Sequence, residues 1–149
     1  MRYLFGFAAI ILIMSWSCST SNTPDVAITS AEKEAFNTKA ADTVRIANDS
    51  VEYEIIIIEP GFYTWLQSIA RPRGYYSQNF LENRNNILVI NFNQRVINPQ
   101  RYDPNLYQFQ IDYRPDIDYG YEVNYLLYNY FIFFQRRFNQ RLSGFVPRL

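Results

Sequence analysis

A chain of 149 residues has room for one folded domain. Its 14 basic and 14 acidic residues cancel, so the bulk charge argues against an electrostatic grip on nucleic acid. The sequence contains no histidine, which excludes Ser-His-Asp catalysis, histidine metal ligation and the commonest general base near neutral pH. With one cysteine and five scattered glycines it also lacks a paired-cysteine metal site and a phosphate-binding glycine loop, and we expect no cofactor and no metal.

The N-terminus has the pattern of an export signal. An apolar run of 14 residues, Tyr3 to Trp16, follows a positively charged start. Such a run is short for a transmembrane helix and typical of the core of a secretory signal. Cys18 follows in SWSC, which resembles a bacterial lipobox. We predict a lipoprotein signal peptide over 1–17 and a lipid on Cys18; the alternatives are a secreted protein with a spare thiol and an uncleaved anchor.

The next segment is polar. Residues 18–50 are mostly Ser, Thr, Asn, Ala, Asp, Glu and Lys, with scattered apolar positions. Such a composition buries too little apolar surface to offset the entropy of ordering the chain. We therefore predict a flexible tether over 18–50, with a short helix from Ser30 to Ala40 capped by Ser30, and a folded domain over 51–149.

The first elements of the predicted domain are a strand and two helices. Residues 50–59, SVEYEIIIIE, begin with alternation and end in an isoleucine run, which predicts a strand covered on both faces in its second half. Residues 62–70 predict a short helix after Pro-Gly. Residues 77–97 keep helical spacing behind a capping Ser77, although 87–92 also has strand propensity, and we favour the helix.

Two further elements complete the prediction. Residues 106–113, LYQFQIDY, alternate well enough for a second strand. Residues 119–142 place their apolar side chains at helical intervals, which predicts a helix that packs on a sheet or on other helices. The order predicts a small α+β domain of two strands packed with about three helices.

The carboxylates before the last helix are the candidate ligand-binding groups. DIDYG contains Asp116 and Asp118, and Glu122 follows. The spacing resembles a fragment of a calcium loop, but the third aspartate and the distal glutamate are missing. Asp118 is therefore better read as accepting amide hydrogens at the helix start, with Asp116 and Glu122 adding favourable charge there.

Aromatic rings supply a second set of candidates. From residue 60 onward, 21 of 90 residues are Phe, Tyr or Trp, and all ten basic residues there are arginine. Tyr121, Tyr125 and Tyr128 fall off the apolar stripe of the last helix, so we expect some of them at a surface or under a loop. Together with Arg95 they could stack on sugar rings or bind a partner protein.

Several motifs resemble a family of small lipoproteins from Bacteroidetes-type bacteria. They are PGFYTWL, YYSQNF, Asn93 and Arg95 of NFNQRV, and IDYGYEVNYLLYNYF. The resemblance covers about Val51 to Leu142 and implies a domain of unknown function in the bacterial cell envelope, with no catalytic role attached. The acid-free STSNTP after Cys18 favours the periplasmic face of the outer membrane.

We therefore predict a non-enzymatic envelope lipoprotein whose domain is a structural or interaction module. Its partners would be the membrane, through the lipid, and an envelope protein or glycan. One alternative is a glycan- or peptidoglycan-binding module that uses a solvent-exposed row of tyrosines with arginines. The other is a carboxylate-dependent hydrolase, which needs two carboxylates about 5 to 10 Å apart in a cleft.

Overall fold

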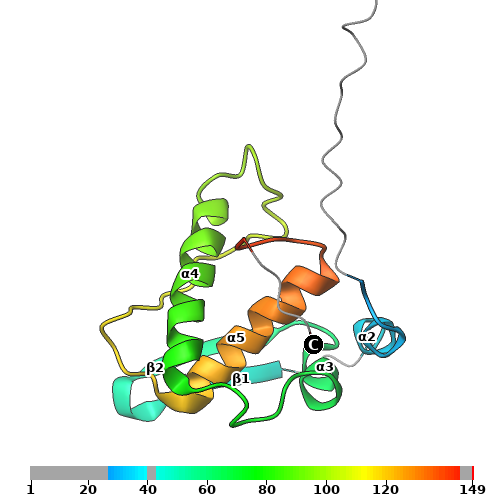
Figure 1. The fold of residues 1–149 in the computed structure, drawn as a ribbon. Coiled ribbons are helices and arrows are strands. Elements are labelled where there is room, and N and C mark those ends of the chain that lie inside the picture. Colours follow the sequence, from blue (N-terminus) through cyan, green and yellow to red (C-terminus); the bar gives the residue numbers. More distant parts are fainter. Residues whose placement is uncertain (1–26, 40–42, 145–148) are drawn as a thin grey trace, which may run out of the picture.

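The computed structural model describes residues 27–39, 43–144 and 149; Cys18 and the predicted signal peptide lie outside them. The described residues form one small α+β domain, and the predicted fold class is confirmed (Figure 1). Helices are found where residues 30–40, 62–70, 77–97 and 119–142 predicted them, and 87–92 is helical. The elements are α2 (Ser30–Phe36), β1 (Thr43–Asn48), the 3-10 turn η1 (Asp49–Val51), β2 (Tyr53–Ile58), α3 (Phe62–Ser68), α4 (Gln78–Val96) and α5 (Gly120–Arg137).

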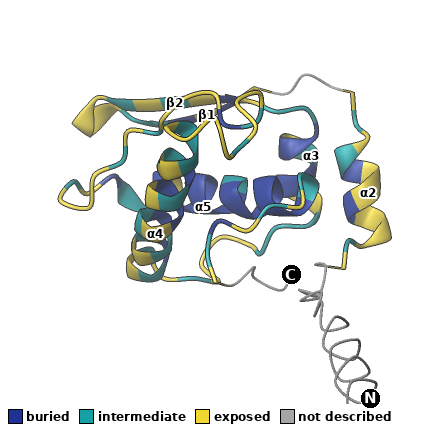
Figure 2. Cartoon of the chain, turned by 90° about the horizontal axis from the view of Figure 1, so that it is seen from above, coloured by how far each residue is buried: buried dark blue, intermediate teal, exposed yellow. Residues whose placement is uncertain are grey.

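Helix α5 runs through the centre of the domain (Figure 2). Thirteen of its 18 residues are buried, because α4, α3 and the sheet pack around it. Asn124, Asn129 and Gln135 lie among the rings of α5, and each donates to a backbone carbonyl one turn earlier. Among the described residues, no helix combines the length and the apolar character that crossing a bilayer requires.

Backbone geometry sets both ends of α5. Gly120 begins the helix with φ +77, a conformation that glycine adopts without a Cβ clash. The helix ends at Arg137, five residues before the predicted Leu142, because Asn139 turns to φ +48 and the Gln140 N–H donates to the Gln135 carbonyl at 2.8 Å. A left-handed residue just past the last turn is a common helix stop.

The folded domain starts well before residue 51, and the prediction of a flexible tether is corrected for residues 27–39 and 43–50. Thr29, not Ser30, caps α2 in a capping box with Glu32. The Glu32 carboxylate is buried against the Arg136 guanidinium of α5. A Cβ on Gly61 would stand 2.3 Å from the Ala35 carbonyl oxygen, so α2 lies directly on the start of α3. Long-range partners of this kind supply the stability that the composition alone lacks.

The second strand of the sheet is β1, from within the predicted tether. It pairs antiparallel with β2 in the register Arg45 with Ile56 and Ile46 with Ile55. Residues 43–47 alternate, because Val44 and Ile46 face the core. The prediction that the isoleucine run of β2 is covered on both faces is wrong, since Ile56 and Ile58 remain 56% and 67% exposed. A sheet with a core on one side covers only alternate side chains.

Residues 106–113 do not form the predicted strand; they lie in the long connection from α4 to α5 (Figure 1). The amide of Asn93 replaces a neighbouring strand, because it donates to the Ile111 carbonyl and accepts from the Ile111 N–H, both at 2.8 Å. Tyr107 is buried against Phe92 and Phe134, which fixes the segment on the core instead of beside a strand.

Candidate functional site

The predicted carboxylates lie close to the start of α5, and each has its own partner. Asp116 forms an exposed ion pair with Arg114 at 2.7 Å, and this hydrogen-bonded arginine holds the pKa of Asp116 below its usual range. Glu122 accepts three hydrogen bonds from the guanidinium of Arg73, at 2.5, 2.9 and 3.2 Å. Two separate arginines therefore hold two of the three carboxylates.

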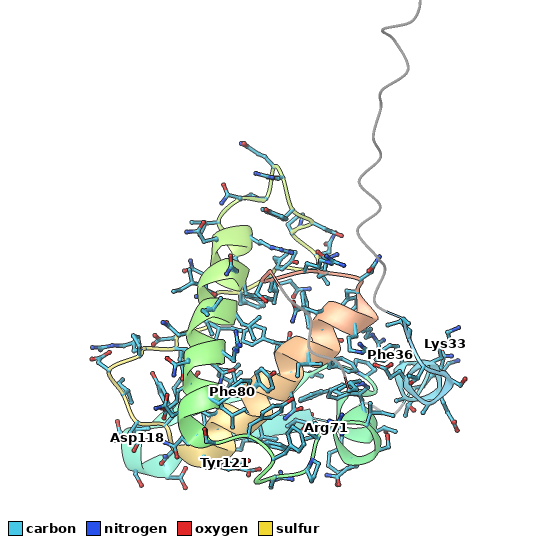
Figure 3. All side chains as sticks on the ribbon, in the orientation of Figure 1. Lys33, Phe36, Arg71, Phe80, Asp118 and Tyr121 are labelled. Atoms are coloured by element: carbon cyan, nitrogen blue, oxygen red, sulfur yellow. The ribbon has the colours of Figure 1, made fainter. Side chains whose placement is uncertain are left out.

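Asp118 has the predicted helix-start role. Its Oδ1 accepts the Gly120 N–H at 2.9 Å and the side-chain amide of Gln78 at 2.8 Å, which joins the first turns of α5 and α4. Figure 3 places Asp118 and Tyr121 at the end of the domain where α5 begins. Among the described residues, no three carboxylates or thiols gather to hold a metal ion.

The three candidate tyrosines do not form an exposed row. Tyr125 and Tyr128 are 2% and 1% exposed. The Tyr125 hydroxyl donates to the Arg71 carbonyl at 2.8 Å, and the Arg73 guanidinium covers its ring at 4.6 Å. Tyr121 is half-buried, and its hydroxyl accepts the Gly74 N–H at 2.6 Å. These rings fasten the loop between α3 and α4 to α5.

Arg95 lies away from the other candidates, near the C-terminal end of α4. It donates to the Tyr107 hydroxyl at 2.6 Å and to Gln140 Oε1 at 3.2 Å, and it also bonds the Arg141 carbonyl. These contacts tie α4, the long connection and the chain after α5 together. The hydrogen bonds of Arg95 therefore connect parts of the folded domain to one another.

A hollow in the described surface lies apart from these residues, along strand β2. We call it the β2 groove. It has a volume of about 940 Å³, and its first wall is the unbroken run Glu52–Glu59. The second wall comes from the long connection, at Asn105, Leu106 and 108–112, and the core side chains Phe92 and Tyr130 also line it. A volume of this size suits a ligand of drug size or a short stretch of peptide.

The surface of the β2 groove combines apolar side chains with negative charge. Phe109 is 80% exposed, which makes it the most exposed large apolar residue of the described chain. Ile56 and Ile58 belong to β2, which pairs with β1, and their side chains lie on the solvent-exposed face of the sheet. Four carboxylates line the groove against one guanidinium, that of Arg137. This guanidinium already donates to the Pro60 carbonyl at 2.5 Å and to a carbonyl of α2.

Glu59 is a partly buried carboxyl among these groove residues. Burial raises the pKa of this carboxyl, and the nearby charge of Arg137 opposes the shift without cancelling it. The raised pKa means that the carboxylate form is less stable here than in water.

Sequence reasoning missed the β2 groove because its two walls are about 50 residues apart in the chain. The available signal was the isoleucine run together with LYQFQIDY, two segments with exposed apolar side chains that the sequence predicts as strands. A smaller, polar pocket of about 450 Å³ does include predicted residues, since Asp116 and Asp118 line it with Gln78, Asn79 and Asn83.

Comparison with known proteins identifies a family. The model described as "Family of unknown function (DUF6146)" matches residues 5–147, which is a wider region than the motifs from Val51 to Leu142 indicated. Neither a curated protein nor a solved structure matches the chain.

Proposed function

The chain belongs to the family of unknown function DUF6146, and from this premise we propose that it is a lipid-anchored cell-envelope protein whose domain binds another macromolecule and catalyses no reaction. The β2 groove is the observation that carries the binding role. The lipid on Cys18 would hold the domain at the outer membrane, facing the periplasm.

The N-terminal pattern supports the membrane anchor. The apolar run and the single Cys18 have the order of a lipoprotein signal, and the family match already begins at residue 5, within that run. Cys18→Ala should abolish fatty-acid labelling and move the protein from the membrane to the soluble fraction. Labelling that persists in the variant would overturn the anchor.

The arrangement of charged groups supports binding over catalysis. A hydrolytic pair needs two carboxylates that converge on one substrate bond. Asp116 and Glu122 are instead held by different arginines, and Asp118 accepts two amide donors. The groove, in contrast, offers apolar side chains and uncompensated charge at a surface, which is the chemistry of recognition.

Site-specific crosslinking in cells tests the binding role. A photoreactive phenylalanine analogue at Phe109, in the groove, should give a discrete adduct whose partner mass spectrometry identifies. The control is the same analogue at Tyr63 of α3, which is 49% exposed and does not line the groove. Equal labelling from both positions, or none from Phe109 in normally expressed protein, would contradict a docking role for the groove.

Glycan binding is a second candidate, and the smaller pocket is the observation that favours it. Side-chain amides and carboxylates line this pocket at the start of α4, and such groups pair with sugar hydroxyls. Titration with soluble peptidoglycan fragments should then show binding that Asp116→Asn weakens and Glu34→Gln, on exposed α2, leaves unchanged. Equal affinity in both variants would remove the pocket from consideration.

A further inference from the structure

Strand β2 presents one unpaired edge to solvent. Its other edge is paired with β1, and within residues 27–39 and 43–144 the sheet has no third strand. Successive side chains of a strand point to opposite faces, so a pocket that touches every residue from Glu52 to Glu59 must run along the strand's edge. No backbone hydrogen bond described in the chain joins β2 to residues 105–112 across the groove.

A free edge of this kind is a template for another strand. Proteins usually protect such edges with proline, lysine or a covering segment, because the unpaired N–H and C=O groups bind any extended chain. Strand β2 contains no proline or lysine, and its isoleucines at 56 and 58 stay exposed. Strand addition supplies affinity through backbone hydrogen bonds and selectivity through alternate side chains.

The charge of the groove selects the kind of strand. Glu52, Glu59 and Asp112 line it without an ion-pair partner among the described residues, whereas Glu54 is paired with Arg45 at 2.6 Å. An arriving strand with basic side chains would meet these carboxylates. A second copy of this chain would bring its own Glu52, Glu59 and Asp112 against them, and like charges face to face oppose binding.

We propose that the β2 groove binds an extended, basic segment of a partner protein, which adds to the free edge of β2 as an antiparallel or parallel third strand. Apolar side chains on one face of that segment contact Ile56, Ile58 and Phe109. Lysine or arginine side chains reach the unpaired carboxylates. The inference rests on the proposed binding role and specifies the chemistry of the partner.

Three synthetic peptides test it with the full-length protein in detergent micelles. The first is eight residues of alternating valine and lysine, as long as the wall Glu52–Glu59. The second replaces lysine with glutamate, and the third carries a methyl group on every backbone amide nitrogen of the lysine peptide. Calorimetric titration should show the lysine peptide binding at least about tenfold more tightly than either of the others, since one lacks complementary charge and the other lacks backbone donors.

Protein variants locate the binding. Glu59→Gln with Asp112→Asn should weaken the lysine peptide about tenfold at low salt, and the loss should shrink as salt screens the charges. The matched control, Glu34→Gln on α2, should leave affinity unchanged. Hydrogen exchange should slow at the amides of residues 53–58 when the lysine peptide is bound, and the far-UV spectrum of both variants should match that of the unaltered protein.

The outcomes separate this inference from the proposed function. Equal binding of the N-methylated peptide, equal binding of the glutamate peptide, or unchanged exchange at residues 53–58 each overturns strand addition by a basic segment. A dimer in sedimentation that Ile56→Thr dissociates also overturns it, because the occupant is then a second copy. If the crosslink at Phe109 persists although strand addition has been overturned, the proposed binding role remains. If neither strand addition nor the crosslink at Phe109 is observed, the binding role is rejected as well.

Discussion

Helix α5 and strand β2 are both rich in large apolar residues, but only α5 is enclosed. Thirteen of the 18 residues of the helix are buried, and even its asparagines at 124 and 129 are buried and bonded within the domain. The strand has the core on one face and one edge paired, which leaves Ile56 and Ile58 uncovered. Burial therefore follows the number of neighbours that the fold supplies, and an apolar residue without a neighbour is available for a partner.

The largest effect should come from a ring of α5. Phe131 is fully buried and contacts Phe92 at 5.8 Å between ring centroids. Phe131→Ala should lower the free energy of unfolding by about 3 to 5 kcal/mol, because it removes buried apolar surface and leaves a cavity. Urea unfolding followed by circular dichroism measures the change. A loss below about 1 kcal/mol would mean that the centre of the domain is loosely packed.

The ion pair between Glu32 and Arg136 should rank next, and its effect should depend on pH. Burial alone raises the pKa of Glu32, but hydrogen bonds from Arg136 and Thr29 and the charge of Arg136 outweigh it, so this pKa lies below its ordinary 4.5. A lowered folded-state pKa contributes stability that is fully present above about pH 4.5 and lost as the pH falls through the folded value.

Glu32→Gln should therefore cost about 3 kcal/mol at pH 7, since it leaves the Arg136 charge buried without its counter-ion. The difference from the unaltered protein should shrink as the pH falls below 4.5. Urea unfolding at pH 7 and in acid, for both proteins, measures it. A difference that stays constant over this range would contradict the ionised state of Glu32.

A smaller loss is expected at the start of α5. Gly120→Ala places a Cβ at φ +77 and should cost about 1 to 3 kcal/mol. Gly144→Ala is the control, because it has ordinary φ and open space around it, and it should change stability by less than about 0.5 kcal/mol. Thermal unfolding of both variants compares them. Equal stability would show that the left-handed start of α5 carries no strain.

The smallest effect on stability is predicted for β2 itself. Ile56→Thr should change the free energy of unfolding by no more than about 0.5 kcal/mol, because its side chain is exposed and threonine favours strands. Ile57→Thr, one residue further and buried on the core face, should cost more than about 1 kcal/mol. Urea unfolding of the pair measures both. A large loss at position 56 would mean that the groove face supports the fold, and the contrast with α5 would fail.

Helical spacing was a better guide to this chain than alternation. The helices at 62–70, 77–97 and 119–142 were predictable because their apolar stripes and caps are local signals, and Ser77 caps α4 as expected. The strand predicted at 106–113 does not form, since alternation alone does not show whether a neighbouring strand exists to pair with. The Asn93 amide takes that place, a contact between residues 18 positions apart. The helix-start role of Asp118 was likewise local, whereas the burial of Tyr125 and Tyr128 depended on a loop from another part of the chain.

By itself the sequence determined the fold class and the positions of the helices, because composition, spacing and caps act over a few residues. Only the tertiary structure decided that residues 30–39 and 43–48 belong to the domain, that β1 pairs with β2, and that an acidic groove opens along the free edge of β2. Each of these depends on contacts between distant segments, such as Glu32 with Arg136, whose energy appears only once the chain has folded.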